Sequence, residues 1–150
     1  MNGEELPRIL CVDDEIRVVE GLAAHLRRNY QVLTANGGTG ALQILKEQGA
    51  PCVIVSDMRM PGMDGATLLK HVKQLYPETT RILLTGETGR DAAIAAVNEG
   101  QIFRFLTKPC APDNLRAAIE AGVEHHRLLL AEKARNYGSG ITRTSTTRPR

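Results

Sequence analysis

Three aspartates stand where their side chains could hold a metal ion. Asp13 and Asp14 directly follow the apolar run RILCV, and Asp57 follows the run CVIVS. Three carboxylates that converge repel one another strongly unless a cation lies among them. Oxygen ligands suit a hard cation, and Mg²⁺ fits best because a few carboxylates, waters and a phosphate oxygen usually hold it. The acids therefore predict a Mg²⁺ site, with Mn²⁺ as the alternative ion.

Two further polar side chains could complete a phosphate site beside these acids. Thr85 ends the run RILLT, and Lys108, followed by Pro109, comes directly after FRFLT. An ammonium group aimed at the acids partly neutralises them, and beside a bound metal it is well placed to hold a phosphoryl oxygen. Pro109 is a candidate for a cis peptide bond with Lys108.

The elements that must position these residues alternate along the chain. Short apolar runs rich in branched residues are followed by segments of helical period, and Gly, Pro, Asp or Asn stands at the junctions. The predicted strands span residues 8–12, 31–35, 52–56, 81–85 and 103–107. The predicted helices span residues 15–29, 39–48, 66–75, 90–99 and 113–135.

This alternation predicts an α/β fold with a doubly wound, five-stranded parallel sheet. The first, third and fourth strands are nearly continuous in apolar residues, as expected for strands covered on both faces, whereas the second and fifth resemble edges. Ligands of such sheets bind beyond the carboxyl ends of the strands. All five polar residues above follow or end a strand, so we expect them to meet there.

The motifs at these positions resemble those of CheY-like receiver domains from two-component response regulators. The matching segments are VDDE, SDMRMPGMDG, LLTGE and FLTKP, in order and at family spacing over residues 8–128. The resemblance implies a flavodoxin-like strand order of 2-1-3-4-5. It also implies that Asp57 is the phosphoacceptor, and that Asp13, Asp14, Asp57 and the backbone carbonyl of Arg59 bind the metal.

The same resemblance assigns the switch residues and the partner. Lys108 would contact the phosphoryl group, Thr85 would swing its hydroxyl toward it, and Phe105 would turn inward by packing alone, since Phe has no hydroxyl. The phosphoryl group would come from a histidine kinase or a histidine phosphotransfer protein. The implied output surface consists of the fourth helix, the fifth strand and the fifth helix, which could also form a homodimer.

Two charged residues at the rim suggest a control on the phosphorylated lifetime. Arg59 and Glu87 each lie two residues beyond a site residue, and we expect their opposite charges to pair across the mouth of the site. Such a pair would limit entry of the attacking water.

The bulk composition sets the class of protein. The 150 residues suffice for one core, and a net charge of +2 with 24% charged residues does not favour direct nucleic-acid binding. No apolar stretch approaches the ~18 residues that a membrane span requires, and the start lacks a secretory pattern. The three cysteines suit a reducing compartment, so we expect a cytoplasmic protein.

We divide the chain into a lead (1–7), a receiver domain (8–128), an extension of the last helix (129–135) and a disordered basic tail (136–150). Leu115, Ile119, Val123 and Leu130 fall near helical spacing and predict a face packed on the sheet that could continue as a dimer seam. His125 and His126, adjacent on that helix, are expected to be solvated rather than metal ligands.

Two other functions fit parts of the pattern. A haloacid-dehalogenase-type phosphatase also forms an aspartyl phosphate, but it has a second acid two residues after the nucleophile, where this chain has Arg59. A scaffold that works without phosphorylation would not require the complete acid pocket with Thr85 and Lys108. The chain is therefore predicted not to be an enzyme, beyond catalysing its own phosphorylation and dephosphorylation.

Overall fold

The computed structural model describes residues 5–143, and the side chains of residues 5–136 within that range. The strands are β1 (Arg8–Val12), β2 (Gln31–Ala35), β3 (Val53–Asp57), β4 (Thr80–Thr85) and β5 (Arg104–Thr107). The helices are α1 (Ile16–Leu26), α2 (Gly38–Gln48), α3 (Gly65–Leu75), α4 (Arg90–Asn98) and α5 (Pro112–Arg143), with a short 3₁₀ turn η2 (Glu87–Gly89) before α4. Each strand lies within one residue of its predicted bounds.

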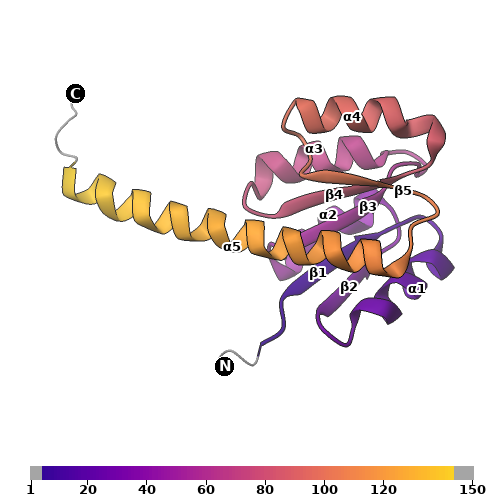
Figure 1. The fold of residues 1–150 in the computed structure, drawn as a ribbon, viewed down its shortest axis with the longest axis horizontal. Coiled ribbons are helices and arrows are strands. Elements are labelled where there is room, and N and C mark those ends of the chain that lie inside the picture. The colour runs from indigo at the N-terminus through magenta and orange to yellow at the C-terminus, as the bar shows by residue number, and fades with distance from the viewer. Residues whose placement is uncertain (1–4, 144–150) are drawn as a thin grey trace.

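The strands form one parallel sheet in the order β2-β1-β3-β4-β5. This confirms the predicted fold class and strand order, with β2 and β5 at the edges. Helices α1 and α5 cover one face of the sheet, and α2, α3 and α4 cover the other (Figure 1). The point where the strand order reverses lies between β1 and β3, so the carboxyl ends of these strands open into the predicted crevice.

The central strands are apolar throughout because both of their faces are buried. In β1, Leu10 belongs to the core beneath α2, α3 and α4, while its neighbours Ile9 and Cys11 belong to the core beneath α1 and α5. In β3, Ile54 and Val53 divide between the two cores in the same way. Alternate side chains of a strand point to opposite faces, so a two-sided sheet needs apolar residues at successive positions.

Helix α5 is longer than predicted. It continues to Arg143, so the predicted helix end at residue 135 is wrong, and residues 136–143 of the predicted disordered tail are helical. The remaining tail residues, 144–150, lie outside the described residues. An established helix adds one hydrogen bond for each further residue without a new nucleation cost, which composition alone does not reveal. The far part of α5 projects away from the sheet (Figure 1).

Only part of the predicted apolar face of α5 packs on the sheet. Leu115 and Ile119 are fully buried and Val123 is partly buried, but Leu130 is 45% exposed, whereas its neighbour Leu129 faces the domain near Pro77. Within residues 5–143, no helix is long and apolar enough to cross a membrane.

Candidate metal and phosphoryl site

The sheet brings the three predicted acids together. Val12 at the end of β1 pairs with Ser56 of β3. Asp13 and Asp57 each come one residue later, so they lie side by side at the ends of two adjacent strands. Asp13 is 1% exposed and Asp57 is 5% exposed, whereas Asp14 is less buried. One carboxylate oxygen from each of the three lies within 4.8 Å of the other two. The register of two neighbouring strands thus produces a compact cluster of negative charge.

The surroundings of Asp13 favour a cation. Its Oδ1 accepts a hydrogen bond from the Glu15 amide at 3.0 Å, but its buried Oδ2 accepts none from the described residues. Burial raises the pKa of Asp13 to about 6, and the charge of Asp57 adds to this, although the Glu15 amide and Lys108 act in the opposite direction. A buried carboxylate oxygen without a donor, among other acids, is a fitting ligand for a hard divalent cation. These residues therefore fit Mg²⁺.

Lys108 supplies the positive charge of the site. Its Nζ lies 2.5 Å from Oδ1 of Asp57 and 3.9 Å from Oδ2 of Asp13. The backbone amide of Lys108 donates to the carbonyl of Thr85 at 2.8 Å, which continues the β4–β5 pairing to the mouth of the site. The Lys108–Pro109 peptide bond is cis, as predicted. The ammonium group thus lies where it would contact a phosphoryl group on Asp57.

Thr85 lies on β4, which pairs with the strand of Asp57, and Phe105 lies on β5, the next strand beyond β4. The Thr85 hydroxyl is buried and donates to the Gly86 carbonyl at 3.1 Å. Phe105 of β5 pairs with Leu83 of β4 and packs, partly buried, against the core beneath α2, α3 and α4. The structure therefore places both residues within the site's supporting strands, with the hydroxyl turned toward the loop after β4.

Two glycines that the sequence analysis did not single out shape the site. A Cβ at Gly65 would lie 2.2 Å from the carbonyl oxygen of Asp57, and a Cβ at Gly89 would lie 2.3 Å from Oγ1 of Thr85. Both distances are far below van der Waals contact, so only glycine lets these helix starts approach so closely. Gly65 ends the segment PGMDG and Gly89 is the second glycine of TGETG, so the sequence contains both glycines but not the contacts that require them.

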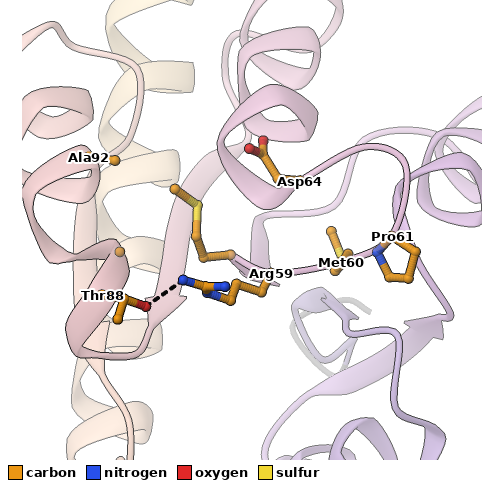
Figure 2. Close-up of a pocket in the computed structure, with 8 residues that line it drawn as sticks. Arg59, Met60, Pro61, Asp64, Thr88 and Ala92 are labelled. Atoms are coloured by element: carbon orange, nitrogen blue, oxygen red, sulfur yellow. Dashed lines mark hydrogen bonds between the residues drawn. The ribbon is translucent and has the colours of Figure 1, made fainter.

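Arg59 does not pair with Glu87, so that prediction is wrong. Its guanidinium donates to Oγ1 of Thr88 at 2.6 Å instead (Figure 2). Among the described residues it forms no ion pair with Glu87. Exposed ion pairs contribute little, so a nearby hydroxyl can compete with a carboxylate for an exposed guanidinium. The hydrogen bond crosses one end of a groove of about 550 Å³ that Met58, Met60, Asp64 and Ala92 help to line.

This geometry coincides with a match to a known family. The family model described as response regulator receiver domain matches residues 9–120, which include all of the site residues above. The chain belongs to this family.

Receiver domains of known structure and longer regulators are both similar to this chain. The hydrogenase transcriptional regulatory protein HoxA of Cupriavidus necator is 38% identical over 116 residues, and HoxA of Bradyrhizobium diazoefficiens is 35% identical over 120. These alignments cover 77% and 80% of this chain, and the chain spans about a quarter of the length of either relative, 24% in both cases.

Solved structures confirm the receiver fold. A response regulator receiver domain protein from Clostridium thermocellum superposes with a TM-score of 0.78 at 34% identity, covering 83% of this chain and 99% of that one. The adenylate cyclase from Rhodopirellula baltica superposes with a TM-score of 0.86 at 36% identity, covering 88% and 98%. This receiver is therefore similar to proteins that are named for different functions, and the shared fold does not determine its role.

Proposed function

We propose that this receiver domain is a switch that accepts a phosphoryl group onto Asp57 from a phosphohistidine of a sensor histidine kinase or a histidine phosphotransfer protein. The observation that carries the proposal is the environment of Asp57: a buried carboxylate at a strand end, 2.5 Å from the Lys108 ammonium and beside an oxygen of Asp13 that accepts no hydrogen bond from the described residues. Such a site holds an anionic group only when positive charge is concentrated around it.

The chain's own residues account for the transfer step. A carboxylate oxygen of Asp57 attacks the phosphorus, the new O–P bond forms, and the N–P bond breaks with its electron pair going to the imidazole nitrogen of the donor. Lys108 exchanges its contact with Asp57 for a contact with a phosphoryl oxygen. Asp13, Asp14, Asp57 and the backbone carbonyl of Arg59 would hold Mg²⁺ or Mn²⁺, which would neutralise charge on the equatorial oxygens.

The switch would then act through β4 and β5. When the Thr85 hydroxyl leaves the Gly86 carbonyl for a phosphoryl oxygen, it vacates space beside β5, and Phe105 moves inward. Because Phe carries no hydroxyl, only packing favours the inward position. The face formed by α4, β5 and α5 changes as a result, and it contacts a target, an output domain or a second copy of the chain.

Incubation with Mg²⁺ and a small phosphodonor, followed by intact mass spectrometry, tests this function. We expect wild type to gain one phosphoryl group and Asp57→Asn to gain none. Rapid turnover of the donor without accumulation of the phosphorylated chain would instead indicate the aspartyl-phosphate phosphatase. No gain and no turnover in the presence of Mg²⁺ would indicate the scaffold. The position that carries the second acid in the phosphatase is Arg59 here, which supports a switch.

The phosphorylated lifetime is proposed to depend on the rim of the site. Arg59 lies two residues beyond Asp57 and Glu87 two residues beyond Thr85. The hydrogen bond from Arg59 to Thr88 ties the loop after β3 to the loop after β4. We expect Arg59→Ala and Glu87→Ala to shorten the lifetime by admitting water, and Thr88→Val to share the effect of Arg59→Ala. Dephosphorylation followed by mass measures this, and rates equal to wild type in both Arg59→Ala and Glu87→Ala contradict it.

The remaining expectations stay predictions. These are a cytoplasmic location, no direct contact with nucleic acid or membrane, homodimerisation through the α4-β5-α5 face or the far part of α5, and a receiver unit over residues 8–128 that is preceded by a short lead.

A further inference from the structure

The far part of α5 is attached to the receiver domain by contacts that the site does not explain. His125 and His126 were expected to be solvated, but both contact the domain. The ring of His125 stacks on Phe103 with centroids 4.7 Å apart and planes inclined by 23°. Nδ1 of His126 lies 2.6 Å from the carbonyl oxygen of Glu78. Because a carbonyl oxygen can only accept a hydrogen bond, Nδ1 carries the proton and donates it.

A second residue of α5, two helical turns beyond His126, also contacts Glu78. Nζ of Lys133 donates to Oε2 of Glu78 at 2.9 Å, and this contact is the largest cause of the lowered pKa of Glu78. His126 and Lys133 are seven residues apart and therefore lie on one side of the helix. Glu78 lies in the loop between α3 and β4. It thus holds α5 at two points about two turns apart, through its backbone carbonyl at His126 and its side chain at Lys133.

These contacts replace close packing. A hollow of about 250 Å³ lies beneath the helix here, and Phe103, His125 and Leu129 are among the residues that line it. A second hollow, of about 550 Å³, lies between Glu78, Leu129 and Lys133. Both hollows are open to the surface, so at these turns the helix is held by a few polar and stacking contacts and not by a buried apolar interface. We call Glu78, Phe103, His125, His126 and Lys133 the clamp.

One strand joins the clamp to the proposed phosphorylation site. Phe103 directly precedes β5, Lys108 directly follows it, and Phe105 lies between them. The strand pairs only with β4, so a shift at its site end is opposed by one neighbour and not by two. The amide of Phe103 donates to the Arg81 carbonyl of β4 at 2.8 Å, which keeps the clamp end in the same ladder. A displacement of β5 at Lys108 therefore moves the surface on which His125 stacks.

We propose that the clamp fixes the direction of the far part of α5 in the unphosphorylated receiver, and that phosphorylation of Asp57 loosens it through β5. The second half of this inference rests on the proposed function, whereas the first half does not. Residues 127–136 would then have a fixed direction relative to the sheet in the unphosphorylated receiver and a less restricted one after phosphorylation.

Hydrogen exchange measured by mass spectrometry on the full chain tests both halves. The variant His126→Ala/Lys133→Ala removes two clamp contacts and keeps helix propensity, because alanine is the best helix former. The matched control is Glu124→Ala/Arg127→Ala, which removes an ion pair within the same helix that does not reach the domain. Without any ligand, we expect amides 127–136 to exchange about tenfold faster in the clamp variant than in wild type, and within about twofold of wild type in the control.

Beryllofluoride with Mg²⁺, a phosphoryl mimic, provides the second arm. We expect it to accelerate exchange of residues 127–136 in wild type and to add nothing in the clamp variant. Equal exchange in the clamp variant and the control would overturn the clamp. If beryllofluoride protects amides around Lys108 but leaves residues 127–136 unchanged in wild type, the coupling is wrong although the site works. If it protects no amide around Lys108, the proposed function fails and the coupling with it, while the ligand-free comparison still decides the clamp.

Discussion

Replacing Asp13 by asparagine should stabilise the metal-free protein. Asp13 is 1% exposed, its Oδ2 has no hydrogen-bond donor among the described residues, and burial together with Asp57 raises its pKa to about 6. Its charge is therefore unfavourable in the folded state. Asparagine keeps a carbonyl oxygen for the Glu15 amide and removes the charge, and its new amide group can donate to Asp57.

The raised pKa sets the size of the effect. The ordinary pKa is 3.8 and the folded value is about 6, a difference of about two pKa units, and each unit corresponds to about 1.4 kcal/mol. A carboxyl whose folded pKa exceeds its unfolded pKa lowers the free energy of unfolding as pH rises from about 4 to about 6, and the full loss persists above that window. The upper bound is therefore about 3 kcal/mol. We expect Asp13→Asn to gain about 1 to 3 kcal/mol near pH 7.5, since the buried amide retains a desolvation cost.

Urea unfolding followed by circular dichroism, with a chelator present, measures this gain. The advantage of Asp13→Asn over wild type should be largest above about pH 6 and should vanish below about pH 3, where the wild-type carboxyl is protonated in both states. Adding Mg²⁺ should stabilise wild type and remove the advantage. Asp14→Asn serves as the control, because Asp14 is less buried and its charge is better solvated. If chelated Asp13→Asn is no more stable than wild type near pH 7.5, the electrostatic account of the site is wrong.

Three further outcomes follow from the same contacts. Lys108→Ala removes the cation 2.5 Å from Asp57, and phosphorylation rates measured by mass should fall at least about tenfold, whereas retention of the wild-type rate would show that the ammonium is not used. Gly89→Ala places a methyl group 2.3 Å from Oγ1 of Thr85 and should lower the free energy of unfolding by about 1 to 3 kcal/mol. The control Gly86→Ala, where a Cβ meets nothing within 4 Å, should change the free energy of unfolding by less than about 0.5 kcal/mol. Equal losses in the two variants would contradict the steric argument. Mg²⁺ should raise the thermal midpoint of wild type and have a much smaller effect on Asp57→Asn, which calorimetry can check.

The sequence could predict most of the fold and the chemical character of the site because both depend on local patterns. Apolar runs such as RILCV and CVIVS mark strands buried on two faces, and Asp13 and Asp57 directly follow two such runs, whereas Lys108 directly follows the edge strand. Parallel strands align their carboxyl ends at one edge of a sheet, so these three residues had to meet. The structure confirms that meeting, with the acids within 4.8 Å and Lys108 at 2.5 Å from Asp57.

Side-chain partners across loops could not be predicted in this way. Arg59 and Glu87 looked like a pair by charge and spacing, but Arg59 donates to Thr88 because the turn Glu87–Gly89 presents that hydroxyl to it. The need for glycine at positions 65 and 89 depends on how closely two helix starts approach other strands, which no local pattern encodes.

By itself, the sequence determined the order of strands and helices along the chain and the set of charges that the strand ends carry, since both follow from the period of apolar residues and from the residue types after each run. Only the tertiary structure decided which groups lack a partner and where α5 is held. The burial of an Asp13 oxygen without a hydrogen-bond donor among the described residues, and the contacts of Glu78 with His126 and Lys133, arise from packing between segments far apart in sequence. Distances between such segments depend on how the whole chain packs, so a local sequence pattern cannot predict them.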